Sequence, residues 1–169
     1  STGCSAESSP SADLAVVVNA VPTFSVTAPS GDQCDDYDLA SAVSGLSGGT
    51  VKYYSDALAA TELGSSTVTS SNTYYAEVDD GNCQSLIKSI VVSVIASPTI
   101  VVGIPPVQCG GTVDLSSSFT QSAGSVSYYS DASANTAIAQ TVSTSGTYYA
   151  QSDDSGCQSA IESVLVTIN

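Results

Sequence analysis

The stretch VKYYSDA at residues 51–57 returns 75 positions later as VSYYSDA at residues 126–132. The stretch TYYA at residues 73–76 returns at residues 147–150. Self-similarity at a nearly fixed spacing identifies tandem copies of one structural unit. We therefore expect two copies of a unit that is shorter than half of the chain.

Two Pro-Thr pairs, at Pro22 and Pro98, precede equivalent stretches of sequence. We accordingly place one unit at residues 20–95 and the next at residues 96–169. A unit of about 75 residues is long enough to bury a core of its own. The chain is also 42% hydrophobic, which is enough to fill two such cores.

Residues 1–19 resemble the end of a further unit, because Gly3-Cys4 corresponds to Gly156-Cys157. The apolar residues that alternate before the first Pro-Thr pair also have counterparts: Leu14, Val16 and Val18 correspond to Val164, Val166 and Ile168. We predict that residues 1–19 form the last strand of a preceding repeat, or a strand exchanged with another unit.

Apolar residues alternate with a period of two, as at Ile90, Val92 and Val94, which is the pattern of a strand with one buried face. Turn-forming residues recur every ~8–12 positions, which is typical of a sandwich or barrel. We predict an all-β chain. The expected strands of the first unit are 22–28, 37–43, 50–55, 61–69, 72–78 and 85–95, with equivalents in the second unit.

The tyrosines are assigned by the same alternation. We expect Val51 and Tyr53 to point into the core, as do their counterparts Val126 and Tyr128. The tyrosines expected to face solvent are Tyr54, Tyr75, Tyr129 and Tyr149. We expect Tyr74 and Tyr148 to anchor the penultimate strand of each unit.

The charge is one-sided, with 16 acidic residues against two lysines and a net charge of −14. Such a surface repels phosphate backbones and anionic membranes, which argues against a nucleic-acid partner. No apolar run approaches the ~20 residues of a membrane span, so we expect no direct membrane insertion.

The order of these motifs resembles a bacterial Ig-like repeat family, found in large surface proteins exported by the gliding-motility (type IX) secretion machinery. The first copy carries the pattern as Cys34, Tyr53-Tyr54-Ser55-Asp56, Thr73-Tyr74-Tyr75, Asn82-Cys83 and Ile90-Val91-Val92. The second copy carries it as Cys109, Tyr128-Tyr129-Ser130-Asp131, Thr147-Tyr148-Tyr149, Gly156-Cys157 and Val164-Leu165-Val166. Asn82 replaces a glycine of the pattern, and tyrosine stands where the family often has tryptophan. The resemblance implies tandem Ig-like β-sandwiches in an extracellular spacer, adhesin or filament, with no catalytic residue to carry over.

Regular cysteine spacing in an extracellular context favours disulfides. Because the family's modules are self-contained, the resemblance implies pairing within each unit, Cys34–Cys83 and Cys109–Cys157. Pairing between neighbouring units, such as Cys34 with Cys157, stays open, since alternating strands would put the two cysteines of a unit at opposite ends of the sandwich. Cys4 is expected to be unpaired or joined to another chain.

Acidic residues gather near turns and are the candidates for calcium binding, the one cofactor considered: Asp35, Asp36, Asp38, Asp79, Asp80, Asp153 and Asp154. We predict that these turns are solvated, since aspartate favours turns in any case. Calcium held between units is the alternative, although the ligand spacing of an EF-hand is absent.

Residues 45–49 read GLSGG and match the G-x-S-x-G pattern of a serine nucleophile. That chemistry needs a histidine base, and the chain has no histidine. Ser122-Ala123-Gly124 stands at this place in the second copy, so we predict a hairpin turn. We expect no catalytic and no cofactor-binding residue, and hence no enzyme.

These features favour a structural, non-catalytic unit of a secreted protein or filament at a bacterial cell surface. The alternative is an adhesin module that recognises a glycan or a protein. The expected partners are copies of the chain itself or adjacent repeats of the same chain, with a surface glycan or protein as the further alternative.

Overall fold

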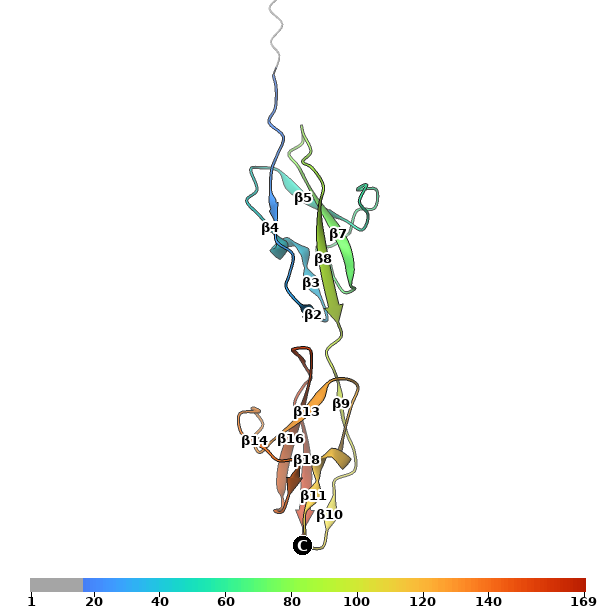
Figure 1. Ribbon diagram of the computed structural model, residues 1–169, viewed down its shortest axis with the longest axis vertical. Coiled ribbons are helices and arrows are strands. Elements are labelled where there is room, and N and C mark those ends of the chain that lie inside the picture. The colour runs from blue at the N-terminus through green and yellow to red at the C-terminus, as the bar shows by residue number, and fades with distance from the viewer. Residues whose placement is uncertain (1–16) are drawn as a thin grey trace, which may run out of the picture.

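The computed structural model describes residues 17–169. These residues form an all-β structure in which two units follow one another along the long axis (Figure 1). Each unit has its own buried cluster, one drawn from residues 24–94 and the other from residues 100–168. The prediction for residues 1–19, including Cys4, lies almost entirely outside the described residues.

The first unit has a four-stranded sheet and a second layer of two short strand pairs. Its elements are β1 (Ser25–Val26), β2 (Asp32–Cys34), β3 (Tyr37–Asp38), the 3-10 helix η1 (Leu39–Ala42), β4 (Val43–Ser44), β5 (Thr50–Tyr54), β6 (Thr67–Val68), β7 (Asn72–Asp79) and β8 (Lys88–Ile95). The sheet has the order β2-β8-β7-β5, and β1–β4 and β3–β6 form the other layer. Strand β2 runs parallel to β8, whereas β5, β7 and β8 are antiparallel.

The second unit repeats this plan. Its elements are β9 (Ile100–Val102), β10 (Val107–Gln108), β11 (Val113–Asp114), η2 (Leu115–Ser117), β12 (Phe119–Gln121), β13 (Ser125–Tyr129), β14 (Ala137–Ile138), β15 (Thr141–Val142), β16 (Gly146–Asp154), β17 (Cys157–Gln158) and β18 (Glu162–Ile168). The larger sheet has the order β10-β18-β16-β13-β14, with β17 paired to β16. Strand β10 is again parallel to the last strand, β18.

Side chains from both layers fill each core. In the first unit, Phe24, Leu39 and Val68 from one layer meet Ile90 and Val92 from the sheet. The alternation of β8 explains this packing, because Ile90 and Val92 are buried while Val91 between them is 62% exposed. The expected alternating strand therefore has its core face where the sequence pattern puts it.

A tyrosine hydroxyl closes the turn before the penultimate strand in each unit. The Tyr74 hydroxyl donates to the Ser70 carbonyl at 2.8 Å, and the Tyr148 hydroxyl donates to the Thr144 carbonyl at 2.9 Å. Such a tyrosine corner is a hallmark of Ig-like sandwiches. In antibody domains a cysteine follows two residues later, but here that position holds Ala76, which is fully buried. The bond that links the two sheets in antibodies is therefore replaced by apolar packing.

Replacing Tyr148 by phenylalanine should remove the hydrogen bond of the corner while keeping the ring in the core. We expect the free energy of unfolding of the second unit to fall by about 1 kcal/mol, the net contribution of one such bond. Denaturant titration followed by tyrosine fluorescence measures this change. Tyr149→Phe is the matched control, because the next residue faces the other side of β16, and its effect should be clearly smaller.

Several expectations need correction. Strand β2 lies in residues 32–34, which none of the expected strands covers, and of the strand expected at 61–69 only Thr67–Val68 is formed. The segment predicted as a strand at 37–43 is interrupted by η1, because the Asp38 carboxylate accepts from the Ala40 amide at 3.0 Å and caps a helical turn. Tyr54 is only 6% exposed, since residues 61–63 return beside it and pair at Glu62. The other three tyrosines expected to face solvent are half-buried.

Candidate functional site: the junction between the units

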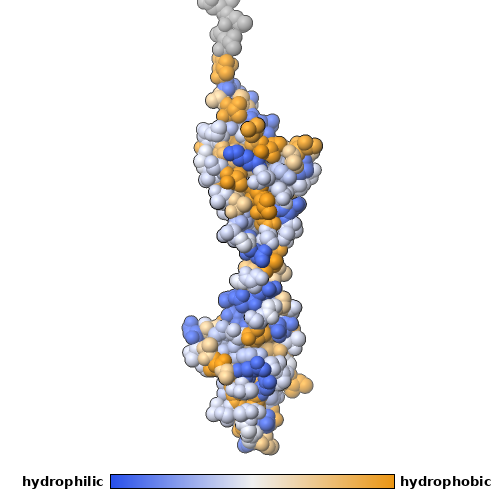
Figure 2. Space-filling view, viewed as in Figure 1, coloured by the Kyte–Doolittle hydropathy of each residue, from blue (hydrophilic) through white to orange (hydrophobic). Residues whose placement is uncertain are grey.

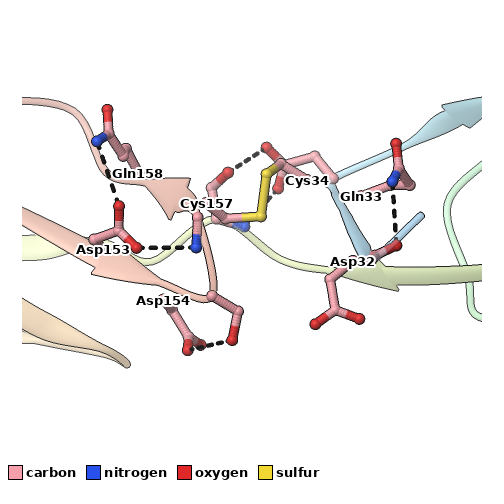
Figure 3. The surroundings of a disulfide bond; sticks show 12 residues. Asp32, Gln33, Cys34, Asp153, Asp154, Cys157 and Gln158 are labelled. Carbon is pink, nitrogen blue, oxygen red and sulfur yellow. Dashed lines mark hydrogen bonds between the residues drawn. A yellow bond between two sulfur atoms is a disulfide. The ribbon is translucent and has the colours of Figure 1, made fainter. Parts of the chain in front are cut away.

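A disulfide between Cys34 and Cys157 joins the two units. Cys34 ends β2 of the first unit, and Cys157 begins β17 of the second unit (Figure 3). The two residues are 123 positions apart in sequence, and their Cα atoms are 5.4 Å apart. Cys157 is fully buried, whereas Cys34 is exposed.

The predicted pairs Cys34–Cys83 and Cys109–Cys157 are therefore wrong, and the pairing between units that was left open is the one formed. Cys34 lies opposite Ile95 at the end of β8, whereas Cys83 lies before the start of that strand. An eight-residue strand is about 25 Å long, far beyond the ~7 Å limit between the Cα atoms of a disulfide. Among the described residues, Cys83 and Cys109 carry free thiols.

Asp35 fixes the linker beside the disulfide. Its backbone has a φ of 67°, in the left-handed region, and its amide donates to the Ile95 carbonyl at 2.8 Å. Its carboxylate accepts from the Ser97 amide at 2.8 Å and from the Ser97 hydroxyl at 2.7 Å. These bonds lower the pKa of Asp35, the bond from the Ser97 amide most of all. The linker, residues 96–99, is thus held by the same short segment that carries Cys34.

The Cys157 side of the junction is a tight turn. The Asp153 carboxylate accepts from the Gly156 amide at 2.9 Å and from the Gln158 side-chain amide at 3.3 Å (Figure 3). Asp154 pairs with Cys157 across the β16–β17 hairpin. The carboxylate of Asp153 therefore shapes the turn that presents the cysteine.

The carboxylates considered for calcium binding accept hydrogen bonds from turn amides of this kind, and one of them forms an ion pair. Asp79 accepts from the Gly81 amide at 2.8 Å and from the Lys52 ammonium at 3.2 Å. Asp80 accepts from the amides of Asn82 and Cys83 at 2.8 and 2.7 Å. Within residues 17–169, the structure brings together no group of three His, Cys, Asp or Glu side chains that could hold a metal ion.

Each of the remaining calcium candidates makes its contacts in a separate local turn. Asp38 caps η1, and the Ser66 hydroxyl and the Ala40 amide lower its pKa. Asp36 follows Asp35, and its amide donates to the Cys34 carbonyl at 2.8 Å. Asp154 lies 3.4 Å from the Ser155 hydroxyl in the exposed turn. These contacts belong to local turns, which agrees with the preference of aspartate for such positions.

A repeated aspartate shapes the loop that follows β5 in the first unit and β13 in the second. The Asp131 carboxylate accepts from the backbone amides of Ser133, Asn135 and Thr136 at 2.7 to 3.2 Å. Asp56 makes the equivalent three bonds in the first unit. Both aspartates belong to the repeated Ser-Asp-Ala segment, and their equal positions in the two copies are the sequence signal for this shared role.

These bonds make the loop sensitive to acid. The amides of Asn135 and Thr136 lower the pKa of Asp131 below its ordinary value of 3.8. A lowered pKa means that the group stabilises the fold above its unfolded pKa, and that this contribution is lost as the pH falls through the folded pKa. We expect Asp131→Asn to lower the melting temperature at pH 7 and to flatten its decline below about pH 4. Melting curves between about pH 2 and 7 measure this, and Asp154→Asn, in an exposed turn, is the control.

The hairpin turn predicted at residues 45–49 is wrong, because β4 pairs with β1 whereas β5 pairs with β7, so these residues connect the two layers of the first unit. The serine of this GLSGG stretch contacts the segment that enters the unit. The Ser47 hydroxyl accepts from the Thr23 amide at 2.8 Å, and the Ser47 amide donates to the Thr23 carbonyl at 3.0 Å. Ser122 makes the same two bonds to Thr99 in the second unit, both at 2.9 Å. The serine thus fastens the entering segment of each unit to its sandwich.

The strand order, the tyrosine corners and the two separate cores define tandem Ig-like β-sandwich units. No family model and no curated protein matches the chain. Twelve chains of solved structures match it. A titin structure, Titin-A168169, aligns over 89% of this chain and 100% of its own, with 10% identity and a TM-score of 0.33. The N-terminal four Ig domains of Dscam1 isoform 6.9 align over 89% of this chain and 47% of theirs, with 14% identity and a TM-score of 0.34. These likenesses concern the fold alone.

Proposed function

We propose that this protein is a structural, non-catalytic segment of a secreted protein or filament at a bacterial cell surface. The observation that carries the proposal is the disulfide from Cys34 to Cys157, which joins two Ig-like units end to end. Disulfides of this kind persist in oxidising compartments outside the cytosol. Among residues 17–169, no helix is long and apolar enough to cross a bilayer.

Two covalent connections cross the junction, and this supports a role as a stiff spacer. Linked domains move relative to one another by default unless the interface prevents it. Here residues 96–99 form one connection, and the disulfide forms a second. The bonds from Asp35 to Ser97 fix the linker between them. A junction held at two points resists bending in the plane that contains both, which a single flexible linker does not.

The surface agrees with a solvated spacer. Figure 2 shows mostly pale and blue residues on the second unit in this view, with apolar groups in separate patches. Exposed apolar side chains such as Leu58, Leu86 and Ile104 come from different loops. The net charge of −14 keeps separate copies soluble at low salt.

Labelling of intact cells tests the proposed location. Antibodies raised against the purified chain should bind unpermeabilised cells of the source organism, and negative-stain microscopy should place the label on projections from the envelope. Brief treatment of intact cells with pepsin-class protease should remove the label, because the chain has only two lysine or arginine sites for trypsin. Label that appears only after lysis would contradict the proposal.

A shallow groove in the first unit favours the adhesin alternative. It lies between residues 21–24 and Ser85, Leu86 and Lys88, and it encloses about 190 Å³. Ligand pockets usually enclose about 300–1,000 Å³, so this groove suits a single side chain or sugar ring. The second unit has Ala160 and Glu162 in place of Leu86 and Lys88.

Array binding decides between the two functions. A glycan and peptide array probed with the purified chain should give no signal above background if the role is structural. Binding that Leu86→Ser abolishes and Leu58→Ser leaves intact would establish the adhesin instead. Leu58 is a suitable control because it is equally exposed, at 87% against 82%, and lies outside the groove.

A further inference from the structure

The two free cysteines are the repeat counterparts of the two that are bonded. Cys109 holds the place of Cys34 in the second unit, and Cys83 holds the place of Cys157 in the first unit. Both carry free thiols, and Cys109 is exposed. Each end of the described structure therefore presents half of the junction that joins the two units.

The backbone presents Cys109 in the same way as Cys34. Strand β10, just before Cys109, is parallel to β18, as β2 is parallel to β8. The Gly110 amide donates to the Asn169 carbonyl at 2.8 Å, which repeats the bond from Asp35 to Ile95 at the same length. Gly110 has a φ of 70° against 67° for Asp35. The backbone that carries the bonded cysteine is thus already formed around the free one.

Cys83 likewise sits in the counterpart of the Cys157 turn. Asp79 pairs with Gln84 across this turn, as Asp153 pairs with Gln158. The hydroxyl of Ser85 accepts from the Val78 amide at 2.8 Å, and the second unit has the same bond between Ser159 and Ser152, at 2.9 Å. The turn is therefore preformed.

The segment that enters the first unit passes beside Cys83. Its Sγ lies 4.0 Å from the carbonyl oxygen of Asn19. Asn19 is the counterpart of Ile95, the residue that lies opposite Cys34. A cysteine placed beside Asn19 as Cys34 is placed beside Ile95 would reach Cys83.

The chain that enters the first unit is also uncovered. Val17 and Val18 are 81% and 87% exposed, although Val94, the counterpart of Val18, packs against the core of its unit. Pro22 is buried and Thr23 is bonded to Ser47, so the anchored part of the segment begins there. Residues 17–21 can accordingly be displaced without opening the sandwich.

We propose that two copies of this chain join head to tail through a disulfide between Cys109 of one copy and Cys83 of the next. The joint repeats the Cys34–Cys157 junction, and Asn169 takes the place beside Cys83 that Asn19 now occupies. This inference rests on the proposed structural function, and it adds that copies of the spacer assemble with one another.

The joint between copies brings fewer like charges together than the Cys34–Cys157 junction does. Across the observed junction, the disulfide joins the turn that carries Asp153 and Asp154 to the segment that carries Asp35 and Asp36. In the joint between copies, Asp79 and Asp80 would face Gly110 and Gly111 instead. Fewer like charges meet, so less repulsion opposes the contact.

The bond forms by oxidation with a small-molecule disulfide such as oxidised glutathione. The Cys83 thiolate attacks this disulfide, forms a mixed disulfide and releases one glutathione thiolate. The Cys109 thiolate then attacks the sulfur of Cys83 and releases the second glutathione thiolate. The two protein thiols lose two protons and two electrons, and these electrons reduce the small disulfide to two thiols.

The test uses full-length chains in which Cys4→Ser removes the cysteine outside the described residues. One variant adds Cys83→Ser and keeps Cys109, and the other adds Cys109→Ser and keeps Cys83. The Cys34–Cys157 bond stays in both. The two variants carry different affinity tags and are mixed in equal amounts with a glutathione redox buffer in about 0.15 M salt, which screens the net charge.

We expect the mixed dimer to exceed either homodimer by at least about tenfold, whereas random oxidation gives only a twofold excess. Cys4→Ser alone should form a ladder of oligomers, and the peptide map should show Cys109 bonded to Cys83. Small-angle scattering should give the mixed dimer about twice the maximum dimension of the monomer. A random ratio of dimers, or a chain that stays monomeric, would overturn the inference.

A peptide map of native material gives an independent answer. A bond between Cys83 and Cys109 supports the joint between copies. Cys83 bonded to a peptide of another sequence would overturn it, because a different unit then completes the junction. Surface label on intact cells together with monomeric protein would leave the structural function standing, so the two proposals fail separately.

Discussion

The Cys34→Ser variant will lose both stability and the fixed relation of its two units. The disulfide closes a loop across a separation of 123 residues. In the chain-entropy model, closing a loop of this size stabilises the folded chain by about 4–5 kcal/mol, because it restricts the unfolded state. Denaturant unfolding followed by tyrosine fluorescence should therefore show an earlier midpoint, and small-angle scattering should show a wider range of dimensions as the linker bends.

Cys83→Ser is the matched control for this variant. It removes a thiol that is free in the described structure and leaves the junction intact. We expect its monomer to keep the stability and dimensions of the parent chain, and we expect reductant to give the parent chain the properties of Cys34→Ser. Equal midpoints for the two variants under non-reducing conditions would show that the disulfide does not hold the units.

Gly124→Ala will destabilise the second unit by about 3 kcal/mol or more, since it combines two unfavourable effects. Gly124 has a φ of 74°, in the region that side chains avoid. A Cβ at this position would also lie 2.2 Å from the carbonyl oxygen of Asp153, which belongs to the backbone of β16. The sheet would have to separate at the start of β13, and thermal unfolding of the second unit should report the loss.

Two further glycines of the same unit separate these effects. Gly156 has a φ of 92°, but nothing lies within 4 Å of the place that a Cβ would take, so Gly156→Ala should cost only about 1 kcal/mol. Gly146 has an ordinary backbone, and a Cβ there would meet the Tyr148 ring at 3.7 Å, a normal contact. Gly146→Ala should change the stability by less than about 0.5 kcal/mol. A Gly124→Ala variant as stable as Gly156→Ala would contradict the close approach to Asp153.

Most of the sandwich was predictable from local patterns. The alternation of Ile90, Val92 and Val94 predicts which face of β8 is buried, because a strand with one wet face has a period of two. The corner tyrosines Tyr74 and Tyr148 were expected to anchor the penultimate strand, and their hydroxyls do so. These features depend on residues close together in sequence, which is why pattern reasoning reached them.

Strand β2 was not predicted, because its formation depends on residues that are far apart in sequence. Residues 32–34 read DQC and have no apolar alternation, so nothing local distinguishes them from a turn. Their extended form comes from pairing with residues 93–95 of β8, some 60 positions away. Contacts at such a separation leave no periodic signal in the segment itself.

The cysteine pairing was settled by topology and not by spacing. The positions of Cys34 and Cys83 within one unit suggested a loop around that unit. The parallel pairing of β2 with the end of β8 puts Cys34 at the far end, where only the neighbouring unit can reach it. The expected strand order already put the two cysteines of a unit at opposite ends, which argued against a disulfide within the unit.

The same bond determines which parts of the protein carry a load. When the two ends are pulled apart, tension enters along the first strands, crosses from Cys34 to Cys157 through the sulfur atoms, and leaves along β18. The residues between the two cysteines lie off this path and cannot be stretched while the bond is intact. At ~3.5 Å per residue they hold about 400 Å of slack, which only a reductant can release. Under a load applied at the two ends of the chain, residues 35–156 are thereby shielded from stretching, and the extensibility of this segment depends on the redox state of one bond.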